Sequence, residues 1–267
     1  MKIEHLLGSI GSEFADEVVE ALLRRSRGKI TTALKRIRRP EAAVGVVKSS
    51  LGRLLVAMSS SGVALTHYVH DGRDIAATLA TLRLQFDPVE DQRTVREVGK
   101  EISHYVAGDA KALRQRVDLI LAGNAFQKKV LDGLQTVPRG AVVSYQAVGA
   151  AVGSAKAARA VGNALHNNPV PIYIPCHRVI AADGRLGGYV GGPACKLQLL
   201  RSEGFAVDSD TGNISNTTVW GHRGTKMYCK PGCRVAAHGD RTRIVFFANP
   251  EEAQRAGMRP CKICRPV

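Results

Sequence analysis

Cys176 is followed directly by His177, and Asn168 lies eight residues before the cysteine. The stiff apolar stretch of residues 169–175, which holds three prolines, leads into the cysteine. Thiolates rather than thiols attack carbon, and a histidine partner is a common way to form a thiolate near pH 7. An isolated Cys-His pair is more often a buried cysteine beside a surface histidine, but the surrounding sequence here favours a nucleophilic cysteine.

Four further cysteines form two close pairs near the C-terminal end of the sequence, Cys229 with Cys233 and Cys261 with Cys264. Three residues separate the first pair, two separate the second, and 27 residues lie between the pairs. This spacing predicts a tetrahedral Zn²⁺ site, although iron can also occupy four-cysteine sites. His222 and His238 could replace a ligand, but four thiolates complete the shell, so we interpret both as surface histidines. Cys195 matches neither group, and we interpret it as a packing cysteine.

The chain of 267 residues has 38 basic and 23 acidic side chains, a net charge of +15 and a pI near 9.9. This balance predicts a polyanionic partner, and nucleic acid is the first candidate. Acidic residues close to the N-terminus argue against a secretory signal, and no window approaches the ~18 apolar residues of a membrane span. We therefore expect an intracellular protein, in the cytoplasm and nucleoid or in the nucleus, that uses its cysteines for thiol chemistry or metal binding rather than disulfides.

The N-terminal elements follow from the spacing of apolar residues. Residues 1–40 begin with a helical pattern and continue into a basic run, which is either a solvated arm or a segment that binds the DNA backbone. The strands expected next are residues 44–47, 54–58 and 64–69, and the helices are residues 74–86 and 92–107. No group of catalytic carboxylates is evident here, so we interpret this block as structural.

Two short helices are expected shortly before the Cys-His pair. Residues 144–152 and 154–165 have helical patterns joined at Gly153, with Ser154 in position to cap the second helix. Such a pair is a helix-turn-helix, which is common in DNA-binding proteins and also in plain helical folds. Residues 207–219 are polar and turn-forming, which is typical of a linker.

An ordered series of motifs runs through the centre of the chain: Phe126-Gln127, Val137-Pro138-Arg139-Gly140, Ser144-Tyr145, Ala158-Arg159-Ala160-Val161-Gly162, Asn168-Pro169, Pro175-Cys176-His177-Arg178-Val179, Gly187-Gly188-Tyr189, Lys196 and Leu199-Leu200-Arg201-Ser202-Glu203-Gly204. With these motifs, residues 120–206 resemble the O6-alkylguanine-DNA alkyltransferase family. The resemblance implies an α/β and α+β multidomain protein. Its parts would be a ribonuclease-H-like half at residues 41–118 and a catalytic helix-turn-helix domain, winged-helix-like, at residues 119–206.

The resemblance also implies catalytic roles. Cys176 would be the alkyl acceptor, and His177, acting through a water and oriented by Glu203, would take the thiol proton. Asn168 would brace the turn that carries the site. Taken singly, Glu203 is equally well a surface acid and Asn168 a turn residue before a proline; their joint order with the other motifs favours the catalytic roles.

The family's mode of DNA binding implies further roles. A base damaged inside the duplex must be extruded before chemistry, and by resemblance Arg159 is the wedge that fills the gap, while Tyr145 helps rotate the nucleotide and then donates a hydrogen bond. The second helix would lie in the minor groove. The residues expected to contact DNA are Tyr145, Lys156, Ala158, Arg159, Gly162 and Arg178. Val190 departs from the family, in which many members have serine or another polar residue there, so we expect an altered substrate preference.

A second resemblance covers the cysteine pairs. The blocks are Tyr228-Cys229-Lys230-Pro231-Gly232-Cys233-Arg234, Val245-Phe246-Phe247-Ala248-Asn249 and Ala256-Gly257-Met258-Arg259-Pro260-Cys261-Lys262-Ile263-Cys264. They resemble the Ada-type methylphosphotriester repair domain, which implies a small zinc-bound α+β domain at residues 220–267. By resemblance Cys229 is a second methyl acceptor as well as a ligand; a purely structural zinc site would use the same four cysteines.

These resemblances imply a single-turnover DNA repair protein with two acceptor sites. The expected partner is double-stranded DNA that carries alkylation damage, the expected cofactor is Zn²⁺ without any organic group, and the expected state is a monomer away from membranes. Two alternatives remain open: a one-site alkyltransferase whose zinc domain only binds DNA, and a methylation-responsive transcriptional regulator.

Overall fold

The computed structural model of the chain describes residues 39–154, 156–181, 185–207, 218–230, 233 and 243–266, together with Arg24. Most of the expected N-terminal helix and basic arm (residues 1–40) lies outside the described residues. The same holds for residues 208–217 of the expected linker, for Ala155, and for His238.

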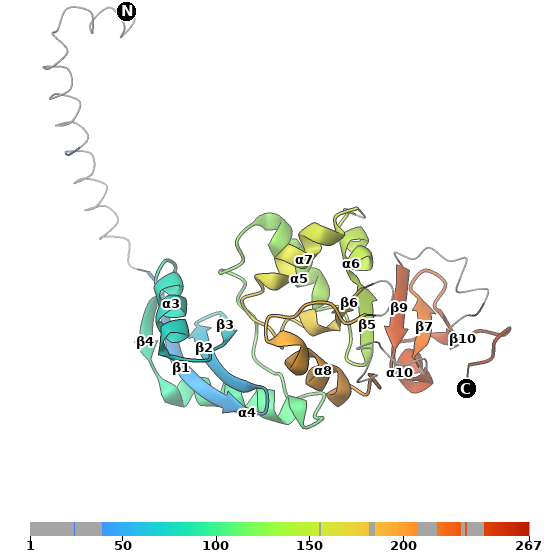
Figure 1. Ribbon diagram of the computed structural model, residues 1–267, viewed down its shortest axis with the longest axis horizontal. Helices are drawn as coiled ribbons and strands as arrows, with labels where there is room; N and C mark the ends of the chain where they lie inside the picture. The colour runs from blue at the N-terminus through green and yellow to red at the C-terminus, as the bar shows by residue number, and fades with distance from the viewer. Residues whose placement is uncertain are drawn as a thin grey trace, which may run out of the picture. The chain divides into compact units, whose positions relative to one another are not determined.

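The first part of the described chain is a four-stranded sheet covered by helices (Figure 1). Its elements are β1 (Glu41–Ser49), β2 (Gly52–Ser59), β3 (Gly62–Tyr68), α3 (Gly72–Leu82), β4 (Asp87–Glu90) and α4 (Gln92–Val106). The first three strands form an antiparallel meander, and β4 pairs in parallel with β1, in the order β3-β2-β1-β4. The sequence patterns predicted the three strands and both helices but not β4. Pro88 is tolerated there because β4 is an edge strand, where a missing N–H donor disrupts no internal pairing.

The central part carries the Cys-His pair. Its elements are α5 (Ala125–Leu134), β5 (Ala141–Ser144), α6 (Tyr145–Ala151), α7 (Ala158–His166), the 3-10 turn η1 (Cys176–Arg178), β6 (Val179–Ile180) and α8 (Gly192–Ser202). Ser144 caps α6 through a bond from the Ala147 N–H, and Gly153 has the positive φ of 83° that the turn requires. The second helix begins at Ala158 rather than at residue 154. Ser154 therefore does not cap it: its carbonyl accepts from the Ala157 N–H in the preceding turn.

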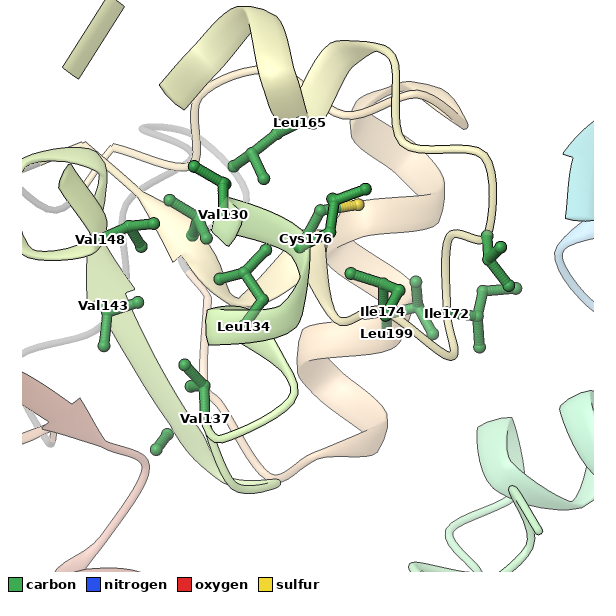
Figure 2. Packing of buried hydrophobic residues seen from close by; sticks show 14 of the residues in the cluster. Val130, Leu134, Val137, Val143, Val148, Leu165, Ile172, Ile174, Cys176 and Leu199 are labelled. Carbon is green, nitrogen blue, oxygen red and sulfur yellow. The ribbon is translucent and has the colours of Figure 1, made fainter. Parts of the chain in front are cut away.

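The core of the central part is built from aliphatic side chains of α5, β5, α6, α7, α8 and the stretch before Cys176 (Figure 2). Val130, Leu134 and Leu199 are fully buried there, and Ile174 joins them from the apolar stretch. The same cluster includes Cys176, so its side chain belongs to the hydrophobic core.

The C-terminal part extends the sheet of the central part. Its elements are β7 (Val219–His222), β8 (Met227–Cys229), β9 (Ile244–Phe247), α10 (Pro250–Arg255) and β10 (Arg259–Pro260). Strand β9 pairs antiparallel with β5, and the resulting six-stranded sheet has the order β10-β8-β7-β9-β5-β6. The sequence patterns predicted neither β5 nor this pairing.

Side chains on both faces of β9 pack against the central part. Phe247 is buried in the same cluster as Val143 and Leu199, while Phe246, the preceding residue of the strand, packs against the cluster that contains Ile180 and Leu200. None of the described helices has the length and apolar character that a membrane crossing requires.

The shared sheet predicts that the central and C-terminal parts unfold together. Phe247→Ala should lower the free energy of unfolding by about 3–5 kcal/mol, because Phe247 is only 2% exposed and its removal leaves a cavity. Trp220 on β7 is the chain's single tryptophan, so its fluorescence reports on the C-terminal part while circular dichroism reports on all helices. The two probes should give coincident thermal transitions in the wild type and in the variant. Val89→Ala at a half-exposed edge position is the control, and separate transitions would contradict the prediction.

Candidate active site and metal centre

Cys176 begins the 3-10 turn η1 and is 4% exposed. Asn168 donates from Nδ2 to the Cys176 Sγ (3.1 Å) and to the Ile174 carbonyl (3.2 Å), and its Oδ1 accepts from the Val170 N–H (3.0 Å). The side chain thus ties the start of the apolar stretch to its end. On the other side, Thr66 of β3 donates from Oγ1 to the Pro171 carbonyl (2.7 Å), so the N-terminal sheet also holds this stretch.

His177 and Glu203 form a buried pair beside the cysteine. The His177 Nε2 lies 2.7 Å from the Glu203 Oε1, and both side chains have no exposure. Burial disfavours the Glu203 anion, but the charges and hydrogen bonds of His177 and Arg178 outweigh it and hold the pKa of the carboxyl well below its usual value. An ionised carboxylate only accepts, so Nε2 carries the proton, and Nδ1 is the unprotonated nitrogen of the neutral ring. Nδ1 is buried and has no hydrogen-bond partner among the described residues.

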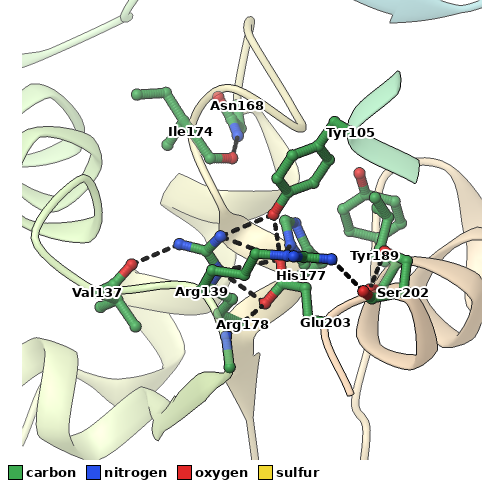
Figure 3. A network of polar contacts seen from close by, with 12 residues as sticks. Tyr105, Val137, Arg139, Asn168, Ile174, His177, Arg178, Tyr189, Ser202 and Glu203 are labelled. Carbon is green, nitrogen blue, oxygen red and sulfur yellow. Dashed lines mark hydrogen bonds and ion pairs between the residues drawn. The ribbon is translucent and has the colours of Figure 1, made fainter. Parts of the chain in front are cut away.

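The Glu203 carboxylate collects donors from three further residues (Figure 3). Arg178 donates from Nε to both carboxylate oxygens (3.1 and 3.0 Å) and from Nη2 to Oε1 (3.0 Å), and the Gly140 N–H donates to Oε2 (3.3 Å). The Tyr105 hydroxyl of α4 donates to Oε1 and accepts from Arg178 Nη2 (2.8 Å). This geometry corrects the expectation that Arg178 contacts DNA: its guanidinium is buried and faces inward, because Glu203 requires a buried cation.

Charge and burial set the protonation of the two reactive groups. Burial raises the pKa of the Cys176 thiol to about 11, although the Asn168 hydrogen bond and Lys196 favour the thiolate. Burial lowers the pKa of His177 despite the opposing effect of Glu203. The resting pair at neutral pH is therefore a thiol beside a neutral imidazole, and the imidazole can act as a proton acceptor.

A cavity of about 420 Å³ opens onto Cys176. Its lining includes Tyr145, Arg159, Tyr189 and Val190, together with Ala158 and Gly162 of α7. Burial and the nearby Cys176 raise the pKa of Tyr145, which keeps its hydroxyl protonated. Arg159 is exposed at the start of α7, so a cation stands at the rim of the cavity. Lys156 is exposed in the preceding turn and does not line the cavity.

The four C-terminal cysteines converge on one point. Their Sγ atoms all lie within 4.8 Å of one another. Tetrahedral zinc with bonds of about 2.3 Å to sulfur needs sulfur atoms about 3.8 Å apart, so the cluster matches Zn²⁺ with little adjustment. The Lys230 N–H donates to the Cys264 Sγ (3.3 Å), the kind of bond that supports a coordinated thiolate. Cys229, Cys233, Cys261 and Cys264 therefore form a four-cysteine zinc site. His222 lies outside this cluster, at the end of β7.

Three residues of the site had no role in the sequence-based hypothesis. Tyr105 comes from the N-terminal half, and no local pattern links it to Glu203. Tyr189 packs edge-on against the His177 ring (centroids 6.3 Å apart), and its hydroxyl lies 3.2 Å from that of Tyr68. Lys196 stood only in the motif series; it is fully buried and donates to the carbonyls of Val179, Leu186 and Gly188. A lysine on the apolar face of α8 is the one signal that pointed to such a role.

Lys196→Met tests the buried ammonium. The variant should lose about 2–4 kcal/mol of unfolding free energy, because three carbonyls lose their donor. Burial lowers the pKa of Lys196 from 10.5 to about 8. Between these values the unfolded chain holds a proton that the folded chain has released, so this group makes the wild type more stable as pH rises. The gap between wild type and variant should widen from about pH 8 to 10.5 in urea unfolding; a constant gap would contradict the shift. Lys100→Met, on the exposed face of α4, is the control.

Comparison with known proteins matches both parts of the site. Residues 125–205 match the family model of the 6-O-methylguanine DNA methyltransferase DNA-binding domain, and residues 206–267 match the metal-binding domain of Ada. Methylated-DNA–protein-cysteine methyltransferase of Methanosarcina acetivorans is 33% identical over 159 residues, which is 60% of this chain and 96% of that protein. The bifunctional transcriptional activator/DNA repair enzyme Ada of Escherichia coli is 37% identical over 158 residues, 57% of this chain and 43% of Ada.

Solved structures agree with these matches. A crystal structure of Mycobacterium tuberculosis OGT in complex with DNA is 30% identical, with a TM-score of 0.50 over 61% of this chain and 92% of that one. A variant of the same protein gives a TM-score of 0.51 over 63% and 96%. The chain belongs to the methylated-DNA–protein-cysteine methyltransferase family and carries an Ada-type metal-binding domain on the C-terminal side of its methyltransferase part.

Proposed function

We propose that this protein is a single-turnover DNA repair protein that moves the alkyl group of O6-alkylguanine irreversibly onto Cys176. The observation that carries the proposal is the position of Cys176 at a cavity, held by Asn168 and adjacent to the His177–Glu203 pair. Membership of the methyltransferase family supports the same conclusion. The substrate is double-stranded DNA with alkylation damage, and the protein acts as a monomer.

Among the described residues, the domain organisation that goes with this function has three parts. Residues 41–118 are a ribonuclease-H-like half, residues 119–206 the winged-helix-like catalytic domain, and residues 220–267 the zinc domain. The β3-β2-β1-β4 sheet with its helices supports the first part, and the α6–α7 pair supports the helix-turn-helix of the second.

The chemistry is an in-line displacement at the alkyl carbon. The Cys176 thiol gives its proton, through one water, to the unprotonated Nδ1 of His177, and Glu203 stabilises the imidazolium. Sulfur then bonds to the alkyl carbon while the bond from that carbon to O6 breaks, and its electron pair goes to the guanine, which takes up a proton. Tyr145 donates its hydroxyl hydrogen bond to the departing base. The thioether has no route back to the thiol, so each molecule acts once.

Access to the lesion requires extrusion of the base into the cavity. Arg159 fills the space that the base leaves, and the small side chains of Ala158 and Gly162 let α7 approach the minor-groove floor. Lys156 adds positive charge for the backbone. The exposed position of Arg159 at the rim of the cavity supports the wedge role.

A second transfer, from DNA methylphosphotriesters to Cys229, rests on the match to the metal-binding domain of Ada. The four cysteines would hold Zn²⁺, which would keep their thiolates deprotonated and nucleophilic. Methylation of one thiolate removes a negative charge from the site and should strengthen binding to phosphates. Cys229 is 3% exposed while Cys264 is the most accessible of the four, so a transfer to Cys229 needs local opening at this edge.

Mass spectrometry of variants in which one cysteine is replaced tests both acceptors. The zinc-loaded wild type, incubated with a DNA duplex that carries O6-methylguanine and a methylphosphotriester, should gain one methyl group on Cys176 and one on Cys229. Cys176→Ala should retain only the second adduct, and Cys229→Ser only the first. Cys195→Ala is the control and should keep both. An adduct on Cys176 alone in the wild type would leave the one-site alternative, and O6 transfer in Cys176→Ala would overturn the main proposal.

Arg159→Ala should slow transfer from duplex DNA about tenfold, since a lost wedge contact of roughly 1.4 kcal/mol raises the free energy of the extruded state by that amount. Transfer from a free O6-alkylguanine base should keep its rate, because no stacking has to be broken. Arg96→Ala, with the same charge change on the exposed face of α4, is the matched control. Equal slowing with duplex and free base would argue against the wedge role.

A further inference from the structure

In the proposed mechanism Glu203 orients the histidine base, and residues from several segments hold its carboxylate. Besides His177, its carboxylate is held by Arg178, by the Gly140 N–H and by the hydroxyl of Tyr105. Tyr105 lies in the last turn of α4, in the half of the molecule that the sequence-based hypothesis treated as structural. Among the described residues of that half, Tyr105 is the one that hydrogen-bonds directly to the His177–Glu203 pair.

The Tyr105 hydroxyl makes two bonds with opposite roles. It donates to Glu203 Oε1, the same oxygen that accepts from His177, and it accepts from Arg178 Nη2 at 2.8 Å. A single oxygen therefore links the anion and the cation on which the histidine depends. The Arg139 guanidinium lies 5.6 Å from the Tyr105 ring centroid and donates hydrogen bonds to the carbonyls of Gly108 and Ser202. Gly108 belongs to the N-terminal half and Ser202 to the catalytic part, so residues of both parts hold the group that packs on the Tyr105 ring.

We propose that Tyr105 is a positioning residue for the transfer reaction, through which the N-terminal half sets the orientation and the basicity of the His177–Glu203 pair. The proposal rests on the proposed function of Cys176. Tyr105 is not among the residues that line the cavity at Cys176; it acts by sharing the Glu203 oxygen with His177. Its hydroxyl is protonated because burial, and next the Glu203 charge, raise its pKa, so it remains a donor across the working range of pH.

The direction of the effect follows from the charges around His177. The groups that face the imidazole are Glu203, Arg178 and Lys196, with Tyr189 against its ring. Removing the Tyr105 hydroxyl takes one donor from Oε1 and leaves more of its negative charge to the His177 N–H. The imidazolium is then favoured, so the neutral base forms only at higher pH. Arg178 Nη2 also loses an acceptor, and the carboxylate is less firmly oriented.

Tyr105→Phe tests the proposal, and Tyr173→Phe is its matched control. Tyr173 donates to Glu101 on the same helix α4 (2.7 Å), also between the two halves, but it has no contact with the relay. The measurement is the single-turnover methyl-transfer rate at saturating methylated duplex, between about pH 5 and 9. In the pH–rate profile of Tyr105→Phe, the maximal (plateau) rate should fall about tenfold. The rise of the rate on the acidic side, the acidic limb, should move to higher pH by about half a unit, and the affinity for DNA should not change. Tyr173→Phe should keep the wild-type limb.

The outcomes separate the possible failures. A Tyr105→Phe limb that coincides with the wild type overturns the positioning role, even if the plateau rate falls, because loss of packing alone does not shift a titration. Equal shifts in both variants also overturn it, since they would come from loosening of the boundary between the halves. If the wild type transfers no methyl group at all, the proposed function itself fails. Thermal melting of each variant, followed in parallel, identifies a fold defect, and the position of the limb remains readable in the folded fraction.

Discussion

The buried charge of Glu203 is the constraint on which the rest of the site depends. A carboxylate without exposure is stable as an anion only if cations and hydrogen-bond donors surround it, and losing one partner of such a group is far more damaging than replacing the whole set. This requirement explains why Arg178, which follows the histidine in sequence, turns inward instead of toward DNA. It also explains why the network extends to Gly140 before β5 and to Tyr105 on α4. Three separate segments are thereby held to one point near Cys176.

The shared sheet imposes a second constraint on the catalytic part. β6 follows directly from η1, it pairs with β5, and β5 pairs with β9 of the zinc-binding part. Strand β6, which follows the Cys176 turn, and strand β8, which ends at Cys229, therefore belong to one six-stranded sheet, in which β5, β9 and β7 lie between them. A four-cysteine zinc site contributes folding free energy to the segment that holds it. Because β9 covers what would otherwise be an edge of the catalytic sheet, that contribution reaches the alkyltransferase core as well.

The sequence predicted the local features and missed the distant ones, for a physical reason. The strands β1 to β3, the helix α4 and the four-cysteine cluster follow from periodicity and ligand spacing, and these depend only on neighbouring residues. The cavity at Cys176 and the proximity of His177 to Glu203 were implied by the resemblance to a known family. No such guide existed for Tyr105, since a single buried polar residue in a helix has no spacing to read, and Lys196 stood in the motif series without a role. The β5–β9 pairing was missed because the sequence of a short strand does not indicate which distant strand it pairs with. Arg178 was misassigned because a basic residue beside a DNA-binding site resembles a phosphate contact until its burial is known.

The environment of Cys176 also suits an acceptor that is used once. A thiolate exposed to solvent reacts with oxidants and with any soft electrophile, and an irreversible acceptor has no means of recovery from such a reaction. Burial raises the thiol pKa to about 11 and keeps the sulfur in its unreactive form. Burial also keeps the His177 ring neutral, so the proposed base is available although the resting sulfur is protonated. An enzyme with many turnovers would lose rate by keeping its nucleophile protonated and enclosed. A protein that reacts once loses little, and it gains protection for the single reaction it can perform.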